Sequence, residues 1–187
     1  MTPLTRMILA IAITVTSAIP ALAEDRNYPD HRLTPGDTLP VTAADICVAG
    51  YARTAREQNH PISRNERAQV YAEYEIVNIR GNNELDHLIS LELGGSNRAS
   101  NLWPQPYHQQ WNAHVKDSLE NKLHDLVCAP GSPEQQQSRL VQAQHEIATD
   151  WIAAYKKYGG RAFGTRRPHQ NRSYDNQENR TNEENNK

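Results

Sequence analysis

The chain has 187 residues, of which 37% are hydrophobic and one is phenylalanine, so one folded domain with a modest core is expected. Its formal net charge of −2 at pH 7 excludes a global electrostatic attraction to nucleic acid. Binding to a polyanion would need local groups of basic side chains, and the candidates are Arg53, Arg56, Arg64, Arg67, Arg80 and Arg98.

Residues 1–23 have the pattern of a secretory signal peptide. Arg6 supplies positive charge, residues 7–19 are apolar, and Ala21-Leu22-Ala23 provides small residues for cleavage. The apolar stretch is short for a membrane span, and a retained N-terminal anchor is the alternative. We expect cleavage after Ala23 and a periplasmic or secreted protein without membrane association.

The segment before the central motif combines loops with short helices. Residues 24–40 contain three prolines and predict an extended arm with little structure. A short helix or turn at 42–45 would deliver Cys47, and a further helix of two or three turns is expected over residues 65–74, with its apolar face formed by Ala68, Tyr71, Ala72 and Tyr74.

Residues 84–104 predict a strand, a glycine loop and a return strand. Asp86-His87 precedes an apolar run, residues 88–93, that would form a half-buried extended segment. Gly94-Gly95 ends that run, because glycine accepts the positive φ of a tight reversal. Asn101-Leu102-Trp103 begins the second apolar stretch, which Pro104 ends.

Two helices should follow the return strand. The first covers residues 107–127, with a buried stripe at Trp111, Val115, Leu119, Leu123 and Leu126. Lys116 with Glu120, and Glu120 with His124, are four residues apart and would pair on its exposed side.

The second helix has stronger end signals. Ser132, Pro133 and Gln135 form its capping pattern and Gly159-Gly160 ends it. Its buried face would comprise Leu140, Val141, Ile147, Ala148, Trp151, Ile152, Tyr155 and Tyr158. Residues 41–160 would therefore form the folded domain, and residues 161–187 a disordered polar tail.

The chain contains two cysteines, Cys47 and Cys128. In an exported protein one disulfide is the leading interpretation, with free thiols or a shared metal as alternatives. The disulfide would tie the N-terminal segment to the end of the helix that follows the motif.

The central motif resembles the HNH branch of the ββα-metal, or His-Me finger, nucleases. It is closest to small secreted bacterial proteins with Asp-His-Leu-Ile-x-Leu-Glu-Leu-Gly-Gly followed by Asn-Leu-Trp-Pro, matched here by residues 86–95 and 101–104. Ser90 departs from the proline usual at its position. The resemblance spans roughly residues 40–155, and it implies an α+β fold in which a small ββα-metal motif is embedded in a mostly helical single domain with one disulfide.

The resemblance also implies roles for individual residues. His87 would be the general base, Asp86 the first metal ligand, and Asn101 the residue whose side chain fixes the loop that holds the base. The metal ion would be Mg²⁺ or Mn²⁺. Neighbouring residues of a regular strand face opposite sides, so Asp86 and His87 can serve one phosphate only if the strand ends, bulges or is approached edge-on there.

The remaining site residues are less well defined by the pattern. The family places a His or Asn about nine residues after the middle Asn, where this chain has Gln110. We prefer His114 as the second metal ligand, followed by Asn112, with His108 nearby. Arg80, Arg98 and Lys116 are the residues that we expect to contact substrate phosphates.

The resulting hypothesis is a secreted, metal-dependent HNH-type endonuclease that acts on DNA, and on RNA as a further candidate, with little sequence specificity. A non-catalytic secreted binding protein on a degenerate HNH fold is the main alternative. A structural envelope protein, in which Asp86 and His87 make a buried hydrogen bond, is the third. The sequence does not indicate the oligomeric state.

Overall fold

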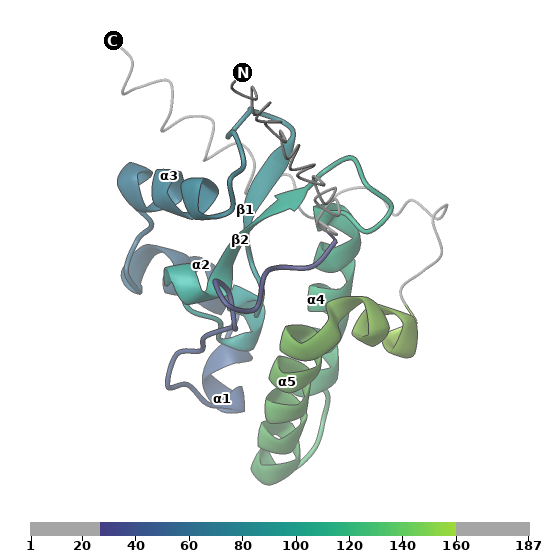
Figure 1. Cartoon of the computed structure of the whole chain (residues 1–187). Coiled ribbons are helices and arrows are strands. Elements are labelled where there is room, and N and C mark those ends of the chain that lie inside the picture. The colour runs from purple at the N-terminus through teal and green to yellow at the C-terminus, as the bar shows by residue number, and fades with distance from the viewer. Residues whose placement is uncertain (1–26, 160–187) are drawn as a thin grey trace, which may run out of the picture.

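The computed structural model describes residues 27–159. Within this range, helices are combined with a two-stranded antiparallel sheet and one disulfide (Figure 1). The elements are α1 (Ala43–Ile46), α2 (Tyr51–Gln58), α3 (Arg64–Glu73), β1 (Asn83–His87), the 3₁₀ turns η1 (Leu91–Leu93) and η2 (Ala99–Asn101), β2 (Leu102–Pro106), α4 (Ala113–Cys128) and α5 (Pro133–Tyr158).

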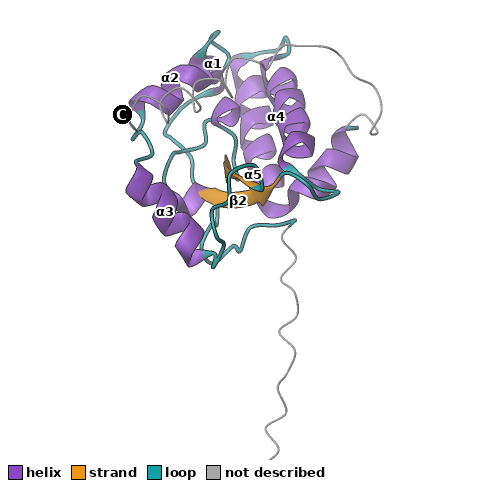
Figure 2. Ribbon diagram, turned by 90° about the horizontal axis from the view of Figure 1, so that it is seen from above, coloured by secondary structure: helices purple, strands orange, loops and turns teal. Residues whose placement is uncertain are grey.

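The hairpin of β1 and β2 lies between α3 and the pair formed by α4 and α5 (Figure 2). Its register places Asp86 opposite Trp103 and Glu84 opposite Gln105. Directly opposed residues share a face, so one face carries these four residues. The other face carries His87 at its end. Its Leu85 and Leu102 form a small apolar core with Val70 and Tyr71 of α3.

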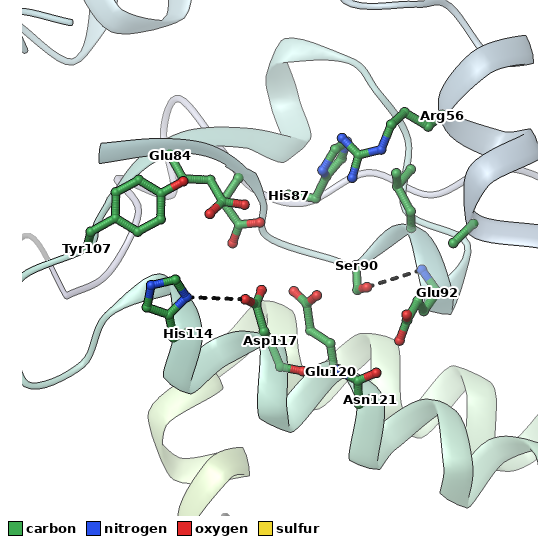
Figure 3. Close-up of a pocket in the computed structure, with 13 residues that line it drawn as sticks. Arg56, Glu84, His87, Ser90, Glu92, Tyr107, His114, Asp117, Glu120 and Asn121 are labelled. Carbon is green, nitrogen blue, oxygen red and sulfur yellow. Dashed lines mark hydrogen bonds and ion pairs between the residues drawn. The ribbon is translucent and has the colours of Figure 1, made fainter. Parts of the chain in front are cut away.

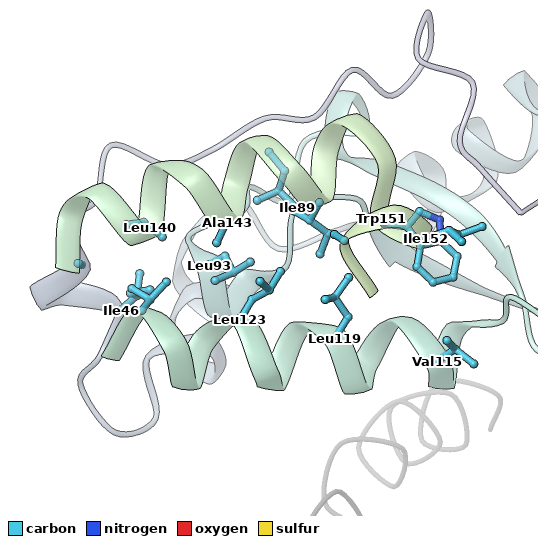
Figure 4. Close-up of a cluster of buried hydrophobic side chains, with 14 residues drawn as sticks. Ile46, Ile89, Leu93, Val115, Leu119, Leu123, Leu140, Ala143, Trp151 and Ile152 are labelled. Atoms are coloured by element: carbon cyan, nitrogen blue, oxygen red, sulfur yellow. The ribbon is translucent and has the colours of Figure 1, made fainter. Parts of the chain in front are cut away.

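The apolar run after His87 does not form the extended segment that its sequence suggests. β1 ends at His87, and Leu91–Leu93 is a 3₁₀ turn. The prediction was wrong because Leu93 and Ile89 are buried between α4 and α5, which a short turn achieves and a straight strand would not (Figure 4).

The two glycines of the loop are needed for different reasons. Gly94 has a φ of 77°, in the left-handed region that glycine accepts without strain. At Gly95 an added Cβ would lie 1.8 Å from the carbonyl oxygen of Ile89. The chain therefore folds back on itself more closely than any side chain at residue 95 would allow.

The main core lies between α4 and α5 (Figure 4). The stripe predicted for α4 is largely confirmed, with Val115, Leu119 and Leu123 buried and Trp111 and Leu126 packed at its margin. Val127 is also buried there. Each fully buried aliphatic side chain stabilises the fold by about 1.5–3 kcal/mol. Because most of the buried apolar side chains lie between α4 and α5, the packing of these two helices is the main apolar contribution to the stability of the domain.

The structure confirms the predicted ends of helix α5, which begins at the Ser132–Gln135 capping box and has Gly159 as its C-cap residue. Its predicted buried face was wrong at Val141, which is exposed, while Ala143 is buried. The helix also has a kink at Asp150 that the periodicity did not predict. The Asp150 carboxylate accepts hydrogen bonds from the Ala153 amide at 2.9 Å and the Tyr28 hydroxyl at 3.1 Å, so it caps the last part of the helix.

The arm before α1 has no helix or strand over residues 27–37, as expected, but it is not loosely attached. Trp151 Nε1 donates to the carbonyl of Asn27 at 2.8 Å, and Thr34 Oγ1 donates to that of Leu102 at 2.8 Å. Thr38 forms a β-bridge with Gly95. The arm is therefore without regular secondary structure, as predicted, but it packs across the glycine loop and β2.

The helices before the hairpin were predicted incompletely. The structure confirms a helix at 42–45 and one at 65–74, as α1 and α3, whereas α2 was not predicted. In α3 the buried residues are Val70 and Tyr71, and Ala68 and Ala72 are exposed. The predicted signal peptide and polar tail lie outside the described residues. In residues 27–159, no helix is long and apolar enough to cross a membrane.

The predicted disulfide is confirmed. Cys47 is the C-cap residue of α1 and Cys128 is the last residue of α4, and the two Cα atoms are 5.5 Å apart. The bond closes a chain segment with a sequence separation of 81 residues. It therefore joins α1 to the end of α4, one of the two helices that form the main core.

Removing this bond should lower stability strongly. Replacing both cysteines with serine should reduce the free energy of unfolding by about 4–5 kcal/mol, the chain-entropy value for a loop of this size. Urea denaturation of the double variant and the oxidised wild-type protein tests this. Equal midpoints for the two proteins would contradict the assigned contribution of the bond.

Candidate functional site

A cleft of about 350 Å³ lies between the end of β1 and the first half of α4 (Figure 3). Side chains from β1, the loop after it, α2 and α4 point into it. Its polar and charged lining comprises Arg56, Glu84, Asp86, His87, Ser90, Glu92, Tyr107, His114, Asp117, Glu120 and Asn121. The cleft is thus rich in carboxylates and holds the Asp-His pair of the motif.

Asp86 and His87 both reach this cleft although they are adjacent in the strand. Asp86 lies on the face that looks toward α4, and His87 is the last residue of β1. Beyond it the Leu88 amide donates to the Asn101 carbonyl at 2.8 Å. The end of the strand at His87 therefore allows two neighbouring side chains to line one cavity.

The imidazole of His87 is buried and only 4% exposed. Burial lowers its pKa to about 4, and the nearby guanidinium of Arg56 acts in the same direction (Figure 3). Asp86 opposes this shift but does not overcome it. His87 is therefore neutral at pH 7, and one of its ring nitrogens carries a free electron pair.

Asn97 determines which ring nitrogen carries the proton. Its Nδ2 donates to two backbone carbonyls, those of Asn59 at 2.9 Å and Arg56 at 3.2 Å, which orients its amide. Its Oδ1 therefore faces His87 Nε2 at 2.8 Å and must accept a proton from it. The neutral imidazole is then protonated at Nε2, and the lone pair is on Nδ1.

Asn101 is completely buried, and its side chain holds the loop together. Its Oδ1 accepts from the amides of Ile89 at 2.9 Å and Asp37 at 3.3 Å. Its Nδ2 donates to the carbonyls of Ile89 and Ser96, each at 2.9 Å. Asn101 does not line the cleft, and its contacts fix the loop that follows His87.

Lys116 occupies an unexpected position. Its side chain is fully buried, and its Nζ donates to Asp86 Oδ2 at 2.8 Å, to the His87 carbonyl at 2.5 Å and to Glu120 Oε1. Burial opposes its charge, but Asp86 and Glu120 outweigh burial and raise its pKa. The prediction that Lys116 contacts substrate phosphates was wrong, because its ammonium is already enclosed by three acceptors.

The ion pair between Lys116 and Glu120 exists, but not on the exposed side of α4 where it was predicted. It faces the cleft and is buried. The other predicted pair was also wrong, because His124 Nε2 bonds to the Ile46 carbonyl at 3.2 Å and not to Glu120. The side of α4 opposite to the core is therefore the wall of the cleft and not a solvated face.

Crowding of carboxylates shapes the electrostatics of the cleft. Burial, assisted by the charges of Asp86 and Asp117, raises the pKa of Glu84 to about 8. Burial also raises the pKa of Glu120, and the Lys116 ammonium that contacts this carboxylate opposes the shift. Within residues 27–159, no group of three or more His, Cys, Asp or Glu side chains is arranged to hold a metal ion.

The two candidate ligands on α4 have different surroundings. Asn112 is the N-cap of α4, where its Oδ1 accepts from the Val115 amide at 3.1 Å and its Nδ2 donates to the Gln109 carbonyl at 2.9 Å. It does not line the cleft, and capping uses its side chain, so its assignment as a ligand was wrong. His114 does line the cleft, stacked on Tyr107 and 3.8 Å from Asp117.

The predicted phosphate-binding arginines are exposed but lie outside the cleft. Arg80 is in the loop before β1, and Arg98 is 3.9 Å from the Asp37 carboxylate. Arg56, which the sequence marked only as one of several local arginines, lines the cleft beside His87. Arg56 is thus the basic side chain best placed to meet an anion there.

Sequence reasoning missed several residues of the cleft, although signals for some of them were present. Glu84 and Asp86 are two apart in a strand and so share a face. Asp117 and Glu120 are three apart in a helix and so are neighbours on one side. Asn97 had no such signal, because its role depends on where α2 brings two carbonyl oxygens.

Comparisons with known proteins add no assignment. No protein-family model matches the chain, and neither a curated protein nor a solved structure matches it.

The neutral state of His87 can be measured directly. NMR titration of its imidazole should give a pKa near 4 and a proton on Nε2, because burial and Arg56 disfavour the imidazolium. Arg56→Met should raise this pKa, whereas Arg53→Met, an exposed change on the same helix, should leave it unchanged. Titration of His87 close to 6.5 in the wild-type protein would contradict the structure.

The raised pKa of Glu84 predicts how stability depends on pH. This pKa rises on folding from 4.5 to about 8, so the stability that Glu84 contributes below pH 4.5 is lost as pH rises through 8. The lowered pKa of His87 has its opposite effect between 6.5 and 4, so it does not act above pH 6.5.

In chelator, urea unfolding should therefore show decreasing stability between pH 6.5 and 8.5. Glu84→Gln should flatten this decrease, because the amide does not ionise. The matched control is Glu57→Gln, an exposed change on α2. A wild-type stability that is constant over this range would show that the Glu84 carboxyl group ionises normally.

Proposed function

We propose that this chain is a secreted, metal-dependent HNH-type endonuclease that hydrolyses phosphodiester bonds of DNA, with RNA as a further substrate and with little sequence specificity. The observation that carries the proposal is the meeting, in one cleft, of a neutral imidazole with a defined tautomer and several carboxylates from β1 and α4. The chain order β1, β2, α4, a hairpin followed by a helix, supports the ββα-metal motif that we propose here.

His87 is the general base in this proposal. Its Nδ1 lone pair takes a proton from a water molecule, whose oxygen attacks the phosphorus atom while the bond to the leaving oxygen breaks. Asn97 keeps the proton on Nε2, and Asn101 fixes the loop that carries both residues. The pKa of about 4 makes His87 a weak base that is fully available at neutral pH.

The donor atoms of the cleft are of the type that a hard divalent cation prefers, and a bound ion would have to draw them together, because they are not arranged as a metal site in residues 27–159. Glu84, Asp86 and Asp117 offer carboxylate oxygens, which Mg²⁺ and Mn²⁺ prefer, and His114 lies beside them. Burial is the main cause of the raised pKa of Glu84, and the charges of Asp86 and Asp117 add to it; an added cation would offset this repulsion. When bound, such an ion supplies positive charge that stabilises the scissile phosphate and the leaving oxygen.

The charge of the cleft supports a requirement for added cation. Five carboxyl groups line it, those of Glu84, Asp86, Glu92, Asp117 and Glu120, and Arg56 is the cationic side chain in its lining. A phosphodiester anion would be repelled by the ionised groups. A divalent ion would reverse this repulsion, and Arg56 would then add a second positive contact.

One observation favours the non-catalytic alternative. Asp86 and Glu120 are bound to Lys116, so two carboxylates of the cleft already have an internal cation. If Lys116 stays bound to these carboxylates, the cleft keeps the fold of a nuclease site but does not bind a metal ion. The chain would then bind a partner without cleaving it. Cleavage assays decide between the two functions.

Purified protein without residues 1–23 should convert supercoiled plasmid to nicked and linear forms with Mg²⁺ or Mn²⁺ and should be inactive in EDTA. His87→Ala should lower the rate by about 10²–10⁴-fold, the usual contribution of a general base, while DNA binding in a gel-shift assay is retained. His145→Ala, an exposed histidine change on α5, is the control.

Equal cleavage in EDTA would remove the metal mechanism. Unchanged rates for His87→Ala would remove the proposed base. Absence of cleavage of both DNA and RNA across a broad metal screen would establish the non-catalytic alternative.

A further inference from the structure

The ammonium of Lys116 is completely enclosed by acceptors. An ammonium group has three N–H donors, and the structure gives Nζ three partners, namely the Asp86 carboxylate, the Glu120 carboxylate and the His87 carbonyl. The side chain has no exposed surface, so it cannot touch a substrate. Its contacts are all with groups that form the end of β1 or the wall of the cleft.

The position of Lys116 in its helix does not explain its burial. It is the fourth residue of α4, near the helix N-terminus, where the helix dipole favours anions over cations. Burial of a charged group is also unfavourable unless the group is paired. The ion pairs with Asp86 and Glu120 are therefore what holds this lysine inside the protein.

We propose that Lys116 is the resident cation of the cleft and competes with a divalent metal ion for Asp86 and its neighbouring carboxylates. This inference rests on the metal site of the proposed function. It assigns to Lys116 a role that neither general-base chemistry nor substrate binding requires. In the metal-free protein, the lysine neutralises the carboxylates that would otherwise repel one another.

Competition follows from the short distance between Asp86 and the ammonium. Lys116 Nζ is 2.8 Å from Asp86 Oδ2, so any metal ion bound by the same carboxylate would lie within a few ångströms of a like charge. Like charges this close repel strongly in an environment shielded from water. The wild-type cleft should therefore bind a divalent ion more weakly than the same carboxylates would without the lysine.

A role for Lys116 in orienting Asp86 for the metal ion makes the opposite prediction. If Lys116 served only to orient Asp86 for the metal ion, its removal would weaken metal binding. If it is the resident cation, its removal strengthens metal binding and makes the fold depend on the metal ion. The sign of the change in affinity therefore separates the two roles.

The test is Lys116→Met, which keeps the length of the side chain but removes its charge. Calorimetry should show Mn²⁺ binding at least tenfold tighter than to the wild-type protein. In EDTA the melting temperature of the variant should be lower than that of the wild type, and Mn²⁺ should raise it by more. Lys122→Met, at an exposed position of the same helix, is the matched control and should change neither quantity.

A second variant covers the case in which Lys116→Met does not fold in EDTA. Lys116→Met combined with Glu120→Gln removes the cation and one buried carboxylate together, and it too should bind Mn²⁺ more tightly than wild type. Adding Asp86→Asn to Lys116→Met should abolish the gain, which would place the ion at Asp86.

Affinity for Mn²⁺ that is unchanged or weaker in the folded lysine variants would overturn the inference. Cleavage is not measured in these experiments, so they are decided separately from the proposed function. If the lysine variants bind Mn²⁺ more tightly but the wild-type protein cleaves neither DNA nor RNA, the inference about Lys116 is supported and the proposed nuclease function is contradicted.

Discussion

The buried amide of Asn101 is the interaction on which the motif most depends. It bonds to the amide and the carbonyl of Ile89, and to the carbonyl of Ser96. Each of these backbone groups would otherwise be buried without a partner, at a cost of about 1–3 kcal/mol per group. The loop after β1 keeps its shape because one side chain satisfies them together, and it thereby holds His87 at the end of its strand and Asn97 beside it.

A second constraint is electrostatic. The cleft contains more carboxylates than cations, and several are half-buried or buried. The disulfide and the apolar contact between α4 and α5 hold α4 in place, so the carboxylates of β1 and α4 cannot move apart to relieve their repulsion. Lys116 offsets part of this repulsion from inside the protein. The carboxylates that would attract a cation from solution are therefore already paired in part with the Lys116 ammonium.

Much of the fold could be predicted from local patterns. The α5 capping box, the stripe of α4 and the disulfide depend on nearby residues or on a single pair of cysteines, and the structure confirms them. The prediction of an extended segment after His87 was wrong, because an apolar run has the same composition in a strand and in a buried turn. Only the packing of Leu93 between α4 and α5 distinguishes them.

The candidate site was less predictable for a related reason. Asp86 and His87 stand out by their motif, but the roles of Lys116 and Asn97 depend on contacts between segments distant in the sequence. A lysine four residues before a glutamate on a helix usually indicates a solvated pair. Here that side of the helix faces the hairpin, and the pair is buried.

The central claim is that the cleft between β1 and α4 holds a cation beside His87. Anomalous X-ray diffraction from crystals equilibrated with saturating Mn²⁺ tests it most directly. The account predicts one strong peak in the cleft, in contact with the Asp86 carboxylate. Crystals with no peak in the cleft, or with Mn²⁺ bound only elsewhere on the protein, would contradict it.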